Sequence, residues 1–118
     1  MDVLLVEDEE LIREALAEEL KDCGLAVQEA GNAEDALAMN GADRARVLVT
    51  DVNLGPGMDG IELAEEARRR WPGLRVVVMT GNPGNLDRLS PGLHRAALTK
   101  PFAIGRLVAR VRGLVAQT

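Results

Sequence analysis

Aromatic residues are almost absent from this sequence. Only 2% of the 118 residues are aromatic, namely Trp71 and Phe102, and there is no tyrosine. A surface that binds bases or sugars by stacking needs several rings, so no such surface is expected. The core must be built from aliphatic side chains and methionine. A hydrophobic share of 47% is sufficient for one compact domain of this length.

Cysteine and long apolar runs are also scarce. The single cysteine, Cys23, excludes an internal disulfide and suits a reducing compartment. No uninterrupted apolar run is longer than four residues, the length of Val3–Val6 and Val76–Met79, and this is far too short to cross a bilayer. No basic segment precedes an apolar stretch near Asp2. We therefore expect a cytoplasmic protein with no membrane-spanning segment.

Positive charge is the third deficit. Lys21 and Lys100 are the only lysines, and the formal net charge is −5. A nucleic-acid-binding domain needs a basic face, and the short run Arg68-Arg69-Arg70 is too small to supply one. Direct nucleic-acid binding is therefore not expected.

Short apolar runs alternate with segments of helical periodicity along the chain. The runs are Val3–Val6, Leu25–Val27, Val47–Val49, Val76–Met79 and Ala96–Leu98. Several are continuous, which is typical of parallel strands covered on both faces. Pro91-Gly92 interrupts the fourth predicted helix, between Asn85 and His94. The alternation predicts a single doubly wound α/β domain over residues 1–118.

Helical periodicity also predicts which side chains of two helices are buried. In the first helix the apolar residues recur at three- and four-residue steps, and they predict one buried face: Leu11, Ile12, Ala15, Leu16, Leu20 and Cys23. In the last helix a similar stripe extends to Val115, and part of it could form an interface in a homodimer. Trp71, after the third helix, is expected to cover one end of the sheet.

Polar residues follow four of the predicted strands. These polar segments are Glu7-Asp8-Glu9, Thr50-Asp51, Thr80-Gly81 and Thr99-Lys100-Pro101. In an open α/β sheet, ligands bind in the crevice at the carboxyl ends of the strands. Taken singly, each residue could be a loop cap or a surface charge. Complementary groups at four strand ends instead favour a common site.

The chemistry of these groups points to a phosphate and a hard cation. The carboxylates of Glu7, Asp8 and Asp51 need a counter-charge if they lie close together. Oxygen ligands without histidine or cysteine favour Mg²⁺, which also binds phosphate oxygens. Lys100 and the Thr80 hydroxyl can bind further phosphate oxygens. Asp51 is then the candidate nucleophile, which would form an acyl phosphate.

The sequence resembles the receiver domain of bacterial response regulators, from Val3 to about Val115. The matching stretches, in family order, are Leu4-Leu5-Val6-Glu7-Asp8-Glu9, Asp51-Val52-Asn53-Leu54, Gly57-Met58-Asp59-Gly60, Val78-Met79-Thr80-Gly81 and Leu98-Thr99-Lys100-Pro101-Phe102. The resemblance implies a flavodoxin-like fold, a five-stranded parallel sheet in the order 2-1-3-4-5 flanked by five helices. It agrees with the α/β pattern deduced above.

The resemblance also implies a Mg²⁺ site and a partner. Asp51 is similar to the aspartate that a histidine kinase or histidine phosphotransfer protein phosphorylates. Asp8 and Asp51 are implied as direct Mg²⁺ ligands, together with the backbone carbonyl of Asn53. Glu7 is implied to act on the ion through water.

Two further residues have implied roles at the phosphoryl group. Lys100 would pair with it, and the bond from Lys100 to Pro101 is expected to be cis. The Thr80 hydroxyl would move onto the phosphoryl group as a conformational switch. Gly81 follows, where the family has a small residue that leaves the phosphoryl group accessible.

Three departures from the family pattern concern the output of the signal. The loop Gly55-Pro56-Gly57 is one residue longer than the common form. The segment between Thr80 and Lys100 is short and contains Pro91. Ala97 replaces the tyrosine or phenylalanine that usually swings inward with the threonine. We therefore expect the phosphorylation chemistry to be kept and the readout to be altered.

Two alternative functions share part of this residue pattern. A phosphatase of the haloacid dehalogenase type also uses aspartate, threonine, lysine and Mg²⁺, but it needs a second aspartate where this chain has Asn53. A degenerate receiver would act as an unphosphorylated interaction module. The presence of Asp8, Asp51, Thr80 and Lys100 together argues against that alternative.

Overall fold

A five-stranded parallel sheet forms the centre of the molecule. The computed structural model describes residues 1–117, and its strand order is β2-β1-β3-β4-β5. The strands are β1 (Val3–Val6), β2 (Val27–Ala30), β3 (Val47–Asp51), β4 (Arg75–Thr80) and β5 (Leu98–Thr99). The strand order that the family resemblance implied is confirmed.

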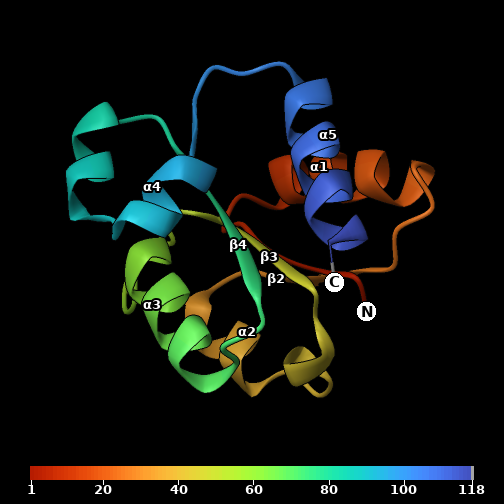
Figure 1. Ribbon diagram of the computed structural model, residues 1–118, viewed down its shortest axis with the longest axis horizontal. Helices are drawn as coiled ribbons and strands as arrows, with labels where there is room; N and C mark the ends of the chain where they lie inside the picture. Colours follow the sequence, from red (N-terminus) through yellow and green to blue (C-terminus); the bar gives the residue numbers. More distant parts are fainter. Residues whose placement is uncertain (118) are drawn as a thin grey trace.

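Helices cover both faces of this sheet (Figure 1). The α-helices are α1 (Glu10–Asp22), α2 (Ala33–Ala38), α3 (Gly60–Arg70), α4 (Pro91–Ala96) and α5 (Ile104–Ala116), and two short 3₁₀ helices are η1 (Ala42–Arg44) and η2 (Pro83–Arg88). Helices α1 and α5 pack on one face, and α2, α3 and α4 pack on the other. Within residues 1–117, no helix combines the length and the apolar character that crossing a bilayer requires.

The continuous apolar strands are explained by this double covering. In β1, Val3 and Leu5 belong to the core under α1 and α5, whereas Leu4 and Val6 belong to the core under α2, α3 and α4. Successive side chains of a strand point to opposite faces, so a strand buried on both sides needs an apolar residue at every position. Trp71 follows α3 and is half-buried against the second of these cores.

The predicted buried face of α1 is only partly correct. Leu16 and Leu20 are buried, but Leu11 is 81% exposed, and Ile12 and Ala15 are exposed as well. Cys23 is half-buried at the end of the helix. The chain enters α1 from the carboxyl end of β1, so its first turn lies at the edge of the sheet, where the core under α1 does not reach. Periodicity identifies the apolar side of a helix but not how far the core extends along it.

Two predicted strands are displaced along the chain. Strand β2 covers Val27–Ala30 rather than Leu25–Val27, because Val27 is the residue that pairs with Val3 of β1. Leu25 instead donates its amide to the Leu20 carbonyl at the end of α1. Strand β5 covers Leu98–Thr99 rather than Ala96–Leu98, because Ala96 is the last residue of α4.

The predicted fourth helix is also corrected. Pro91 does not interrupt a helix between Asn85 and His94 but starts one, as the first residue of α4. Proline is favoured at that position, since the first amide of a helix has no partner within the helix and proline's φ angle is already helical. The residues before it form η2 instead of a longer helix.

Candidate functional site

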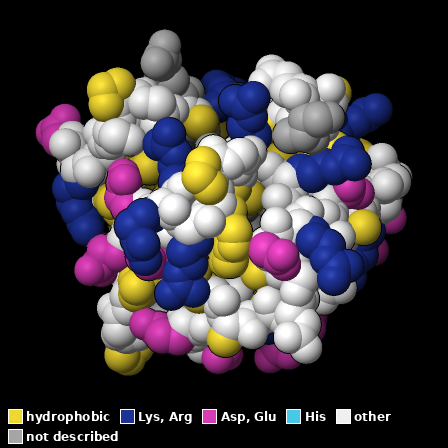
Figure 2. Space-filling model, turned by 60° about the horizontal axis from the view of Figure 1, so that its bottom comes forward, with side chains coloured by type: hydrophobic (Ala, Val, Ile, Leu, Met, Phe, Trp, Pro, Cys, Tyr) yellow, Lys and Arg dark blue, Asp and Glu magenta, His cyan; other side chains and the backbone are white. Residues whose placement is uncertain are grey.

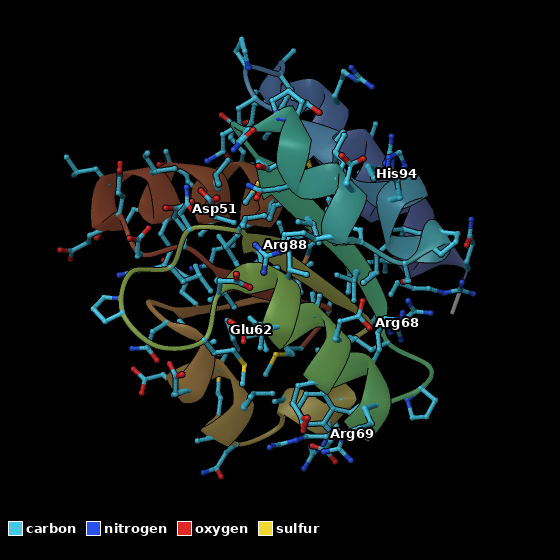
Figure 3. The ribbon with its side chains drawn as sticks, turned by 90° about the vertical axis from the view of Figure 1, so that its left-hand side faces the viewer. Asp51, Glu62, Arg68, Arg69, Arg88 and His94 are labelled. Carbon is cyan, nitrogen blue, oxygen red and sulfur yellow. The ribbon has the colours of Figure 1, made fainter. Side chains whose placement is uncertain are left out.

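The four predicted polar segments do meet at one edge of the sheet. Asp51 and Thr80 are the last residues of β3 and β4, Glu7 follows β1 directly, and Lys100 follows β5. All these strands are parallel neighbours, so their carboxyl ends lie together. Figure 3 shows Asp51 at this edge, far from Arg69 at the opposite end of α3.

An ion pair between Lys100 and Asp51 lies at the centre of the site. The Lys100 Nζ atom is 2.5 Å from Oδ2 of Asp51, and Asp51 is only 7% exposed. The other carboxylate oxygen accepts a hydrogen bond from the amide of Asn53 at 3.2 Å. Lys100 is anchored by its own amide, which donates to the Thr80 carbonyl at 2.7 Å, and its bond to Pro101 is cis, as the family resemblance implied.

Glu7 is a buried carboxylate that is incompletely satisfied. It is 1% exposed, and its Oε1 accepts one hydrogen bond, from the Glu9 amide at 3.2 Å. Its Oε2 is buried and has no hydrogen-bond partner among the described residues. Burial, together with the nearby carboxylates of Asp51 and Asp8, raises the pKa of Glu7 to about 7. The site therefore has an excess of negative charge at its floor.

These carboxylates fit a hydrated hard cation. The partnerless oxygen of Glu7 can accept a hydrogen bond from a water of such an ion, and a positive charge would favour the ionised form of all three acids. Asp8 is exposed at the rim and Asn53 is also exposed, so both can be reached from solvent. Within residues 1–117, no group of three or more His, Cys, Asp or Glu side chains is close enough together to form a metal cluster. The charge of Asp51 is balanced by Lys100.

The Thr80 hydroxyl is hydrogen-bonded to the segment that follows β4. It donates to the carbonyl of Asn82 at 3.1 Å, and it accepts from the Asn82 amide and from Nδ2 of Asn85, each at 3.0 Å. Thr80 is buried, with its hydroxyl held by the segment that begins η2. Sequence reasoning missed Asn82 and Asn85. The only signal available was an asparagine before Pro83, a common start of a short helix.

The backbone of Asp51 packs against the start of α3. A Cβ atom on Gly60 would lie 1.8 Å from the Asp51 carbonyl oxygen, so only glycine fits there. The Gly60 amide donates to the Val52 carbonyl at 2.8 Å. Asp59 caps the helix through a reciprocal capping box with Glu62. Sequence reasoning noted Gly60 only as part of a motif, since this contact joins α3 to the end of β3.

The arginine run that ends α3 and the single histidine of the sequence lie outside the site. Arg69 and Arg70 both form ion pairs with Glu66 on the same helix, which reduces the charge of the arginine run that ends α3. On the face shown in Figure 2, Lys and Arg side chains are dispersed among other types rather than gathered in one block. His94 is exposed on α4, well away from Asp51 (Figure 3).

The fold and the site together define a class of protein. A doubly wound sheet carries acidic residues after β1, an aspartate at the end of β3, a threonine at the end of β4 and a lysine after β5. Residues 3–112 match the response regulator receiver domain family, and the chain belongs to that family.

Similar proteins support this assignment. The chain is 36% identical over 121 residues to response regulator MprA of Mycobacterium leprae, covering 100% of this chain and 52% of that protein. The chain thus spans about half the length of the curated relatives it matches.

Among solved structures, the NtrX receiver domain of Brucella abortus is 32% identical with a TM-score of 0.83, covering 99% of this chain and 100% of that one. The response regulator TrrA of Thermotoga maritima, solved in complex with Mg²⁺ and beryllofluoride, is 30% identical with a TM-score of 0.84, covering 97% and 99% of the two chains.

Proposed function

We propose that residues 1–118 are a single phosphoacceptor receiver domain of a two-component signalling system. Asp51 accepts a phosphoryl group from a phosphorylated histidine of a kinase or a phosphotransfer protein. The observation that carries this proposal is the Lys100–Asp51 ion pair, which lies beside the partnerless buried oxygen of Glu7. A carboxylate that is partly buried, paired with a single ammonium group and surrounded by acids is suited to exchange a phosphoryl group.

The acidic side chains would hold Mg²⁺. Asp8 and Asp51 would bind it directly together with the Asn53 carbonyl, and Glu7 would accept a hydrogen bond from one of its waters. When bound, the ion neutralises charge on the phosphoryl group during transfer. The buried position of Glu7 supports this arrangement, because it provides negative charge that solvent does not screen.

The transfer step forms one bond and breaks another. A carboxylate oxygen of Asp51 bonds to phosphorus while the bond from phosphorus to the donor nitrogen breaks, and the electron pair returns to the imidazole of the partner. Lys100 then pairs with a phosphoryl oxygen in place of the Asp51 carboxylate. The Thr80 hydroxyl leaves the Asn82 carbonyl and donates to a second phosphoryl oxygen. Later hydrolysis of the acyl phosphate restores the starting state, so the chain is a switch rather than a turnover enzyme.

The structural response differs from that of a receiver with a switch aromatic. Ala97 is half-buried after α4 and packs against the core under α2, α3 and α4. Its methyl group cannot report a movement of Thr80 by swinging into the space that Thr80 vacates. The segment between Thr80 and α4 must therefore carry the change itself.

Intact mass after incubation with Mg²⁺ and acetyl phosphate tests the proposal. We expect a labile gain of one phosphoryl group that Asp51→Asn abolishes and that chelation of Mg²⁺ with EDTA prevents. Glu10→Gln, an exposed acid on α1, is the matched control and should leave the gain unchanged. No gain in the unmodified protein would instead favour an interaction module. Continuous release of phosphate from many phosphate esters would favour the phosphatase.

A further inference from the structure

We propose that Asn85 is a positioning residue that holds the Thr80 hydroxyl in the unphosphorylated state, so that phosphorylation releases η2. The juxtaposition that carries this inference is the 3.0 Å hydrogen bond from Asn85 Nδ2 to Thr80 Oγ1. The inference rests on the proposed function, since it concerns how the same site is regulated. According to this inference, η2 changes position when Asp51 is phosphorylated. In other receivers an aromatic side chain at the position of Ala97 makes that response.

All the hydrogen-bonding capacity of the Thr80 hydroxyl is in use. A hydroxyl has one hydrogen to donate and two lone pairs that accept. Here the hydrogen goes to the Asn82 carbonyl, and the lone pairs accept from the Asn82 amide and from the Asn85 side chain. Thr80 therefore cannot donate to a phosphoryl oxygen without giving up an existing bond. A rotation of its side chain toward Asp51 breaks all three.

Asn85 differs from Asn82 in what it connects. The bonds to Asn82 involve backbone two residues away and close a local turn, whereas Asn85 reaches Thr80 from within η2 through its side chain. The backbone amide of Asn85 also donates to the backbone carbonyl of Asn82 at 3.0 Å. Loss of the Asn85 side-chain bond thus removes the direct tie between the Thr80 hydroxyl and the 3₁₀ helix.

The opposite end of η2 is tied by a second side chain. Arg88 donates to the Asp59 carboxylate at 2.7 Å, and Asp59 caps α3 next to the backbone of Asp51. No residue of η2 is buried. Leu86 is half-buried and packs against the core under α2, α3 and α4, and the polar ties of Asn85 and Arg88 add to that contact in positioning η2. Figure 3 shows Arg88 between Asp51 and α3.

Binding of beryllofluoride with Mg²⁺, a phosphoryl mimic, measures the strength of this restraint. Asn85→Leu keeps the approximate size of the side chain and removes the donor. The variant starts without the bond that the wild type must break, so it should bind beryllofluoride about fivefold more tightly, as expected for one hydrogen bond. Asp87→Ala is the matched control, because Asp87 is exposed on η2 and pairs with no described residue. It should bind as the wild type does.

A double-mutant cycle separates a positioning role from a structural one. In a Thr80→Val background there is no hydroxyl to hold, so Asn85→Leu should no longer change the affinity. Amide hydrogen exchange should give the same result. Beryllofluoride should accelerate exchange at the amides of residues 84–88 in the wild type, and Asn85→Leu should show the faster exchange without beryllofluoride.

Three outcomes would overturn the inference. An unchanged affinity in Asn85→Leu, or the same change in both backgrounds, overturns the role of Asn85 alone. Failure of the wild type to bind beryllofluoride in a manner that depends on Asp51 overturns the proposed function and the inference with it.

Discussion

The Arg88 side chain donates to the Asp59 carboxylate at a distance of 2.7 Å and joins η2 to the first turn of α3. Burial raises the pKa of Asp59, but the hydrogen bond from the Glu62 amide and the ion pair with Arg88 outweigh it, so the pKa lies below the ordinary value of 3.8. A carboxyl group whose pKa is lowered by folding stabilises the folded protein at pH values above the pKa of the unfolded state. That stabilisation is lost as the pH falls through the folded-state pKa.

Arg88→Ala should therefore raise the pKa of Asp59 toward its ordinary value. The destabilisation caused by this substitution should be present at neutral pH and should shrink in acid, once Asp59 is protonated. Carboxyl NMR titration of Asp59, combined with urea unfolding at neutral and acid pH, measures both effects. Arg75→Ala is the control, because Arg75 is exposed and pairs with no carboxylate within residues 1–117. Equal pKa values in the two variants would contradict the prediction.

Gly60→Ala should be strongly destabilising. The added methyl group would lie 1.8 Å from the Asp51 carbonyl oxygen, and backbone cannot yield as a flexible side chain can. We expect a loss of about 3 kcal/mol or more in the free energy of unfolding. In Gly113→Ala, the matched change within α5, nothing lies within 4 Å of the added atom, and a gain of about 0.5–1 kcal/mol is expected. Urea unfolding of both variants decides, and similar losses would refute the steric argument.

Mg²⁺ should stabilise the protein through Asp8. A ligand present at 100 times its dissociation constant stabilises the folded state by about 2.7 kcal/mol, if it binds only that state. Asp8→Asn should lose most of this stabilisation, whereas Glu9→Gln, an exposed neighbour, should keep it. Thermal unfolding with and without Mg²⁺ measures the difference. A full Mg²⁺ effect in Asp8→Asn would remove Asp8 from the proposed ligands.

Leu11 and Leu20, two of the leucines of α1, should respond differently to substitution. Leu11 is exposed at the start of the helix, so Leu11→Gln should change the free energy of unfolding by no more than about 0.5 kcal/mol. Leu20 is fully buried against the sheet, and Leu20→Ala should cost about 2–5 kcal/mol. A large loss for Leu11→Gln in urea unfolding would indicate that the first turn of α1 is packed in solution.

Several features of the site were predictable because they depend only on the direction of the strands. An apolar run such as β1 must be covered on both faces, and parallel strands place the residues that follow them at a common edge. Asp51 and Lys100 could therefore be placed at one site from the sequence, although they are 49 positions apart. The start of α4 at Pro91 was missed, because proline either breaks a helix or begins one and the choice depends on the packing of its neighbours.

The sequence by itself determined the doubly wound sheet and the edge at which Asp51, Thr80 and Lys100 gather. Both follow from hydrophobic periodicity and strand polarity, which are properties of the chain read in order. Only the tertiary structure decided that the Thr80 hydroxyl bonds to Asn85 and that Gly60 rests on the Asp51 carbonyl. Hydrogen-bond partners and close contacts depend on the relative positions of separate elements to within a fraction of an ångström, and no periodic pattern along the chain records those positions.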